Sequence, residues 1–143
     1  MAERTNQRGS VLMLMPAAVL IFVILGAICV DFGVAYSAQR QLAVAAAAAA
    51  NDVATQAIDL DLLYSTGEVR LLPDVARRVA ERSVAAKALD RFEAAVADVE
   101  VDGAAVTVTL IGRARYLFAK AVPGGPDGTD LRAHAEVQAE ESG

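Results

Sequence analysis

The sequence is poor in the side chains on which most enzymes and metalloproteins depend. Its 143 residues include no Trp, one Cys and one His, and the length allows one domain at most. One cysteine cannot form an intrachain disulfide or a thiolate cluster, and Cys29 reveals nothing about redox compartment because it lies inside an apolar run. The only histidine, His134, has no nucleophile motif around it. We therefore expect no catalytic residue, no metal and no cofactor.

Positive charge is also scarce. The chain has 13 Lys and Arg against 18 Asp and Glu, a formal net charge of −5 and a pI near 4.8. Such a protein presents no basic field to phosphates, which argues against nucleic acid as a partner. No phosphate-binding motif or other small-molecule site is evident either.

Apolar residues, by contrast, are in excess. They make up 55% of the chain and are concentrated in residues 10–30, which carry no charge. Crossing a bilayer takes ~20 apolar residues, so we predict a transmembrane helix over 10–30. The alternative is a cleavable signal peptide, but its apolar core usually spans only 7–15 residues. The candidate cleavage sites after the run, at residues 34–36 and 36–38, also match the small-x-small pattern poorly.

The flanks of this run predict its orientation. Residues 1–9 carry two Arg and one Glu, whereas the chain after residue 30 holds 17 of the 18 acidic residues and 11 of the 13 basic ones. By the positive-inside rule, residues 1–9 form a cytoplasmic basic tail and residues 31–143 lie outside the cytoplasm. We expect a single-pass protein of the inner (cytoplasmic) membrane.

The next segment, residues 31–59, predicts an Ala-rich stem helix. It has no Pro and contains six consecutive alanines, Ala45 to Ala50. Because Ala is the strongest helix former, we expect one rod from Ser10 to Ile58, ~70 Å long. Its small side chains favour close packing against other helices; a solvated stalk filled with Ala is the alternative.

Residues 60–143 predict a small extracytoplasmic α+β domain. Residues 60–72 read as a connection, and Pro73 begins an amphipathic helix with Val75, Val79, Ala86 and Leu89 on one face. Alternation from Val99, around Asp102-Gly103, indicates a hairpin with Val106, Val108 and Leu110 facing inward. A third strand buries Leu131, Ala133, Ala135 and Val137. We expect the amphipathic helix to pack on this three-stranded antiparallel sheet.

Three other groups of charged residues have ordinary structural interpretations. The basic row on the amphipathic helix is interleaved with acids and reads as a solvated face. Asp127 and Asp130 lack the closing Glu of a helix-loop-helix calcium site. Asp59 and Asp61 are interpreted as ending the long helix, where negative charge is unfavourable.

The residues around the membrane exit carry a resemblance. Arg8-Gly9-Ser10, the apolar run, then Asp31, Gly33, Tyr36, Arg40, Leu42 and the Ala run resemble the N-terminal segment of TadE/TadG-like proteins, pseudopilin-like components of bacterial Flp (tight adherence) pilus assembly. The C-terminal half, with Gly112-Arg113-Ala114-Arg115 and a closing strand over residues 131–137, is similar to exported domains of that family.

The resemblance implies cleavage by a prepilin peptidase between Gly9 and Ser10. The chain departs from the family at two positions. Family members have a Glu five residues into the mature chain, where this chain has Leu14, and commonly an Asp within the Ala run, where this chain has Ala47. A length of 143 residues also leaves no room for the large adhesion-type domain of full-length TadG.

Together these observations predict a non-enzymatic, bitopic component of Flp/Tad-type pilus assembly or secretion machinery. Its partners would be the lipid bilayer and other pilus or pseudopilin subunits, or platform proteins. Helix packing between subunits is expected at Gly33, Tyr36, Ala46 and Ala49. The alternative is a membrane-tethered module that binds a cell-envelope ligand.

Overall fold

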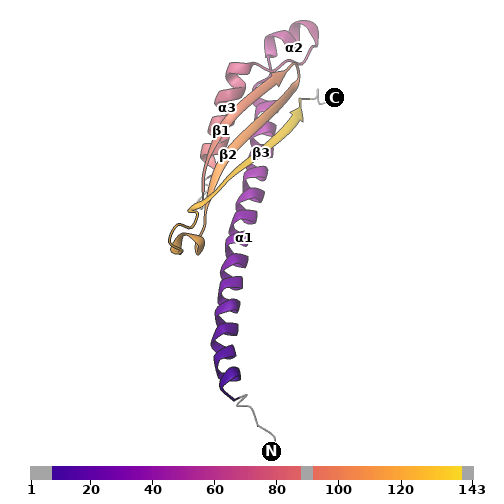
Figure 1. Ribbon diagram of the computed structural model, residues 1–143. Coiled ribbons are helices and arrows are strands. Elements are labelled where there is room, and N and C mark those ends of the chain that lie inside the picture. Colours follow the sequence, from indigo (N-terminus) through magenta and orange to yellow (C-terminus); the bar gives the residue numbers. More distant parts are fainter. Residues whose placement is uncertain (1–7, 88–91, 140–143) are drawn as a thin grey trace, which may run out of the picture.

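The fold is one long helix with a small α+β domain gathered along its second half (Figure 1). The computed structural model describes residues 8–87 and 92–139. A long apolar helix, shorter helices and a three-stranded antiparallel sheet confirm the predicted α+β class. In chain order the elements are α1 (Arg8–Gln56), α2 (Leu60–Thr66), α3 (Pro73–Ala86), β1 (Phe92–Asp102), β2 (Ala105–Arg115), the 3-10 turn η1 (Ala119–Ala121) and β3 (Gly128–Gln138).

Helix α1 runs without a break from the apolar run into the domain. Its 49 residues span ~73 Å at 1.5 Å per residue. Pro16 lies inside it and removes one backbone hydrogen bond. The helix ends at Gln56, two residues before the predicted end, because Ile58 is extended and pairs with Leu71 in an isolated antiparallel bridge.

The two halves of α1 have different surroundings. Between residues 14 and 30 every large apolar side chain is exposed. From residue 38 onward the helix buries a stripe at spacings of three and four residues, which is one face of a helix. The stripe consists of Ala38, Leu42, Ala45, Ala46, Ala49, Ala50, Val53 and Ala54, and the buried Ala57 follows just beyond the end of the helix.

The segment between α1 and α3 was predicted as a plain connection but contains α2. Asp59 is the N-cap of this helix and accepts a hydrogen bond from the backbone N–H of Leu62 at 3.1 Å. Gly67 ends it in the left-handed region, with φ 75°. The reading of Asp59 and Asp61 was therefore wrong: both lie at the start of a helix, where a carboxylate is favourable.

Helix α3 begins at Pro73 as predicted and packs beside α1. It buries Ala76, Val79, Ala80 and Val84, whereas Ala86 is exposed, contrary to prediction, and Leu89 lies outside the described residues. Ser83 donates a hydrogen bond to the Asp52 carboxylate, which joins α3 to α1.

The sheet has the order β1-β2-β3. The predicted inward alternation in β2 is confirmed, because Val106, Val108 and Leu110 are buried. Strand β1 begins at Phe92, earlier than the predicted Val99, and its register shifts between Val96 and Asp98. Such a bulge interrupts the period of two, which explains why the sequence pattern missed the first half of the strand.

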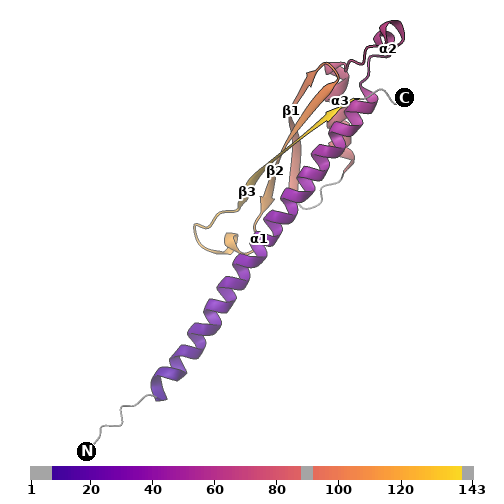
Figure 2. The ribbon, with the colours of Figure 1, turned by 90° about the vertical axis from the view of Figure 1, so that its right-hand side faces the viewer.

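The core lies between the sheet and both long helices. Figure 2 shows α1 running along the sheet, and α1 contacts β2, β3 and α3, while α3 also contacts β1. The amphipathic helix was expected to cover the sheet by itself. Instead, residues 38–57 of the predicted stem cover much of it, because their small side chains let the helix backbone approach closely.

Candidate functional site at the base of the domain

The predicted site residues fall into three groups along α1. Gly9 and Ser10 lie in its first turn. Gly33 and Tyr36 are exposed just where the domain begins. Ala46 and Ala49 are fully buried in the core of their own domain, at 0% exposure. This placement corrects the expectation that Ala46 and Ala49 meet a neighbouring subunit, because the sheet and α3 already cover that face.

The most connected polar side chain of the site is Asp31. It follows directly after the apolar run and is 7% exposed, the one buried charged side chain among the described residues. Its Oδ1 accepts hydrogen bonds from the backbone N–H groups of Leu117 and Phe118 at 2.8 and 3.1 Å, and its Oδ2 accepts one from Ala119 at 2.7 Å. A single carboxylate thus satisfies three consecutive N–H groups at the start of η1.

The ionisation of Asp31 is set by these contacts. Burial by itself raises the pKa of a carboxyl group, because it disfavours the charged form. The backbone N–H groups of Phe118, Ala119 and Leu117 oppose burial and hold the pKa of Asp31 below its usual 3.8. The group is therefore a carboxylate at neutral pH, acting as a hydrogen-bond acceptor and not as an acid.

A second contact supports the same junction. Gln39, two turns further along α1, donates from its Nε2 to the backbone carbonyl of Arg132 in β3 at 3.0 Å. Asp31 and Gln39 together attach the lower end of the sheet and the η1 segment to α1. Sequence reasoning used Asp31 only as part of the family resemblance; the available signal was one acid between Val30 and Phe32 at the end of an uncharged run.

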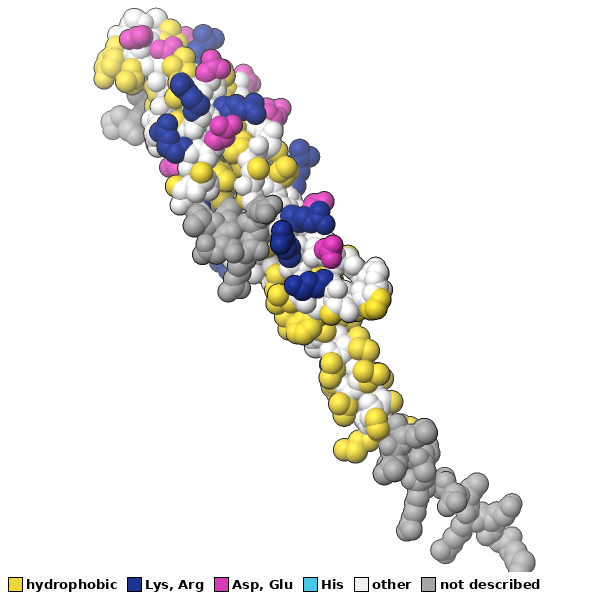
Figure 3. Space-filling model, turned by 90° about the vertical axis from the view of Figure 1, so that its left-hand side faces the viewer, with side chains coloured by type: hydrophobic (Ala, Val, Ile, Leu, Met, Phe, Trp, Pro, Cys, Tyr) yellow, Lys and Arg dark blue, Asp and Glu magenta, His cyan; other side chains and the backbone are white. Residues whose placement is uncertain are grey.

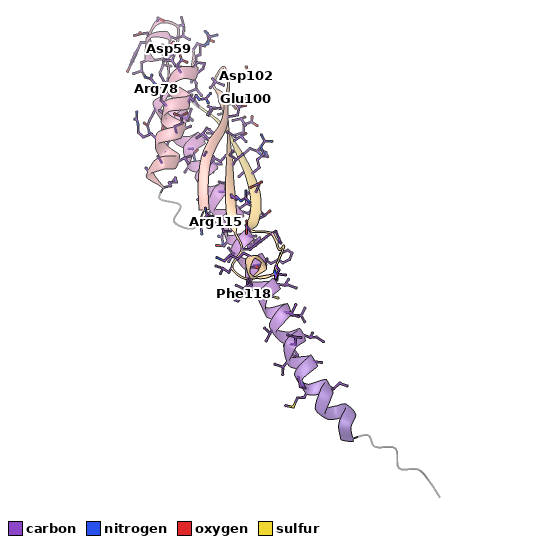
Figure 4. The ribbon with its side chains drawn as sticks, turned by 60° about the vertical axis from the view of Figure 1, so that its left-hand side comes forward. Asp59, Arg78, Glu100, Asp102, Arg115 and Phe118 are labelled. Atoms are coloured by element: carbon purple, nitrogen blue, oxygen red, sulfur yellow. The ribbon has the colours of Figure 1, made fainter. Side chains whose placement is uncertain are left out.

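Apolar side chains surround this junction on the outside. We call five exposed residues at this level the basal collar, and they come from α1 and from the η1 segment. Figure 3 shows hydrophobic side chains covering the base of the domain, with Lys and Arg side chains above them. In Figure 4, Phe118 lies at the lowest point of the domain beside α1, and Arg115 lies above it. The basal collar consists of Ile28, Phe32, Leu117, Phe118 and Val122, which are 48%, 74%, 53%, 48% and 60% exposed.

A cleft lies next to the basal collar, between α1, the η1 segment and β3. It has a volume of about 410 Å³, and its walls are mainly apolar, with Ile28, Phe32, Ala35 and Leu131 among the lining residues. The carboxylate of Asp31 also lines it but is already occupied by three backbone donors. The cleft can hold an apolar group, and Asp31 and Tyr116 are the titratable side chains among its lining residues.

The side chains considered for chemistry do not converge on one site. His134 is exposed on the outer face of β3, and Cys29 is exposed on α1, next to Ile28 of the basal collar. In residues 8–87 and 92–139, no group of three His, Cys, Asp or Glu side chains is placed to hold a metal ion. That the protein is not an enzyme stays a prediction.

No family model, curated protein or solved structure matches this chain. The resemblance to TadE/TadG-like proteins therefore rests on the residues quoted above.

Proposed function

We propose that the chain is a single-pass protein of the cytoplasmic membrane, with its N-terminus in the cytoplasm and its α+β domain outside. In that position it serves as a non-enzymatic, pseudopilin-like subunit of Flp/Tad-type pilus assembly or secretion machinery. The exposed apolar half of α1 carries the proposal: α1 is long and apolar enough to cross a membrane, and only 6% of its most apolar window is buried.

Water is a poor solvent for this half of α1. Its large side chains point outward on every side of the helix, from Leu14 at 67% exposure to Val30 at 43%. Burying one Leu, Ile, Val or Phe side chain contributes about 1.5–3 kcal/mol, and a helix that is apolar all round belongs in lipid or among other helices. Residues 10–30 span ~32 Å, close to the ~30 Å of a bilayer core.

The continuity of α1 favours a permanent anchor over a cleaved signal sequence. The helix passes from the apolar run into the domain core without leaving helical geometry. A cut near residues 34–38 would remove Asp31, whose carboxylate binds the η1 segment. The domain would then lose one of its own contacts, which makes cleavage there costly to the fold.

Lateral packing in an assembly is supported by two glycines of α1. Gly26 and Gly33 are seven residues apart and so lie on nearly the same face of the helix. Apart from the adjacent backbone of its own helix, a Cβ at either position would meet no atom within 4 Å. Glycine inside a helix is about 1 kcal/mol less favourable than Ala, so the fold itself gives no reason for it. Close approach of a neighbouring helix would account for both glycines.

The proposed function is tested by Gly33→Leu in a native host that lacks its own copy of the gene. Membrane insertion and protein level should stay unchanged, because the added side chain enters open space. Pilus or secretion output should fall roughly tenfold, the effect of about 1.4 kcal/mol lost at an interface. His134→Ala is the matched control and should behave as wild type. Equal output from both variants, or full output without the gene, would overturn the proposal.

The alternative, a tethered binding module, makes a different prediction for the same variant. A tether does not need a neighbouring helix, so Gly33→Leu would leave ligand capture intact. Replacing the Ala-rich stem by Gly and Ser does not separate the two functions, because Ala45, Ala46, Ala49 and Ala50 form part of the domain core and both functions need a folded domain.

A further inference from the structure

We propose that residues 116–122 form a second contact with the bilayer, lying in its interfacial layer beside the point where α1 leaves the membrane. This inference rests on the proposed membrane topology and adds to it a surface on the domain. The ligand is the lipid surface itself, with acyl chains meeting the basal collar and headgroups meeting the polar backbone and Lys120.

The position of residues 116–122 relative to the bilayer follows from their contact with Asp31. Its carboxylate binds the N–H groups of residues 117–119 at 2.7–3.1 Å, and it is the first residue after the proposed span. The polar layer on each side of a bilayer is about 5–7 Å thick, close to the 5.4 Å pitch of one helical turn. A segment held at the level of residue 31 therefore falls within this layer.

The side chains of the segment suit that layer. Leu117, Phe118 and Val122 are large, apolar and about half exposed or more, although they belong to the folded part of the chain. Phe and Leu are among the side chains that interfacial helices bury at the boundary between headgroups and acyl chains. Lys120, exposed within η1, has a long apolar stem that can lie along lipid while its ammonium group reaches the phosphates.

The continuity of the basal collar identifies lipid as the occupant. Ile28 and Phe32 are four residues apart on α1, so they lie one turn above the other and join the lipid-facing half of the helix to the η1 segment. A bilayer that surrounds Ile28 therefore reaches the collar without a further partner. A second copy of the chain is the competing occupant, and the experiment below separates the two.

The test places a polarity-sensitive fluorophore on single cysteines of the full chain, reconstituted in vesicles of phosphatidylcholine and phosphatidylglycerol. Cys29→Ser provides the cysteine-free background. Leu117→Cys and Val122→Cys report on the segment, Phe22→Cys reports on the span, and His134→Cys and Tyr64→Cys report on exposed parts of the domain. Nitroxides on the lipid acyl chains quench any label that lies in the bilayer.

Labels at positions 117 and 122 should show blue-shifted emission and quenching by the lipid nitroxide, as at position 22. Labels at 134 and 64 should show neither. Quenching at 22 with water-like emission at 117 and 122 overturns this inference and leaves the membrane proposal standing. Loss of quenching at 22 as well overturns the membrane proposal itself.

Self-association has its own signature. A blue shift at 117 and 122 that lacks lipid quenching and declines as the protein is diluted in lipid would assign the surface to a second copy, and would overturn the proposal of a lipid contact. Because single substitutions at exposed positions rarely unfold a domain, the labelled variants should keep the far-UV circular dichroism of the parent.

Discussion

The two halves of α1 share one backbone and one helical geometry but differ in the size of their apolar side chains. The half over residues 14–30 is rich in Leu, Ile, Val and Phe, all exposed on the chain itself. The half from Ala38 to Ala54 buries a stripe that is mostly Ala, with Leu42 and Val53 as its only larger members. Apolar character alone therefore does not say what a helix packs against.

The difference follows from what each half meets. A helix surrounded by lipid gains from large side chains, because they supply the apolar surface that must be transferred from water. A helix laid against a sheet and a second helix gains from small ones, because they shorten the distance between backbones. The 55% apolar content of the sequence thus combines a lipid-facing surface with a core of small residues.

Filling the small-residue stripe should produce the largest effect. Ala46→Leu with Ala49→Leu inserts two large side chains into positions with 0% exposure. Overpacking costs roughly 1–3 kcal/mol per site, so the domain should lose much of its stability, as seen by thermal unfolding in detergent. Ala43→Leu with Ala47→Leu, at exposed positions of the same helix, is the matched control. Similar melting of both double variants would contradict the docked arrangement.

A charge tests the two environments at equal exposure. Leu20 is 60% exposed in the first half and Val44 is 61% exposed in the second. Leu20→Arg places a guanidinium near the middle of the proposed span, at a cost of about 2.5–3.5 kcal/mol, and should raise the fraction of the protein that carbonate extracts from membranes. Val44→Arg should extract like wild type. Equal extraction of the two variants would contradict the claim that the two halves of α1 have different surroundings.

The junction between the halves should respond to pH. The pKa of Asp31 is lowered in the folded chain, so its stabilising effect is complete above 3.8 and is lost as the pH falls below 3.8 through the lowered folded pKa. Hydrogen-exchange protection of the amides of residues 117–119 should decline over that acidic range. Asp31→Asn should reduce this protection at neutral pH and remove its pH dependence, whereas Asp130→Asn should change neither.

The smallest effect is expected where the chain departs from the resembled family within the Ala run. Ala47 is exposed on the docked half, on the side turned away from the core. Ala47→Asp should lower stability by less than about 1 kcal/mol, mainly because Asp is a poorer helix former than Ala. Urea unfolding of Ala47→Asp and Ala46→Asp measures the difference in stability between the two variants. Ala46→Asp buries an unpaired carboxylate and should unfold the domain.

The sequence predicted the elements with clear periodicity. The unbroken helix, Pro73 at a helix start and the inward residues of β2 were all readable, because each depends on local propensity or on a simple alternation. Strand β1 was read too short because its bulge breaks the alternation at Val96. Helix α2 was missed because seven residues are too few to show a helical period.

The docking of the stem was not readable from the Ala run itself. Six consecutive alanines present the same side chain on every face, so no pattern marks which face is buried. The signal lay outside the run, in Leu42 and Val53, which are eleven residues, or about three turns, apart and share one face. The role of Asp31 could not be derived because its three donors come from residues 117–119, far away in the sequence.

The continuity of α1 also has a mechanical meaning. A span joined to a domain by a loop lets the domain swivel and absorbs tension in the linker. Here the same helix is a structural member of the core, and Asp31 and Gln39 brace the lower edge of the domain against it. In the proposed topology, a force or torque applied to the domain is transmitted directly to the membrane span, because no flexible linker separates the two.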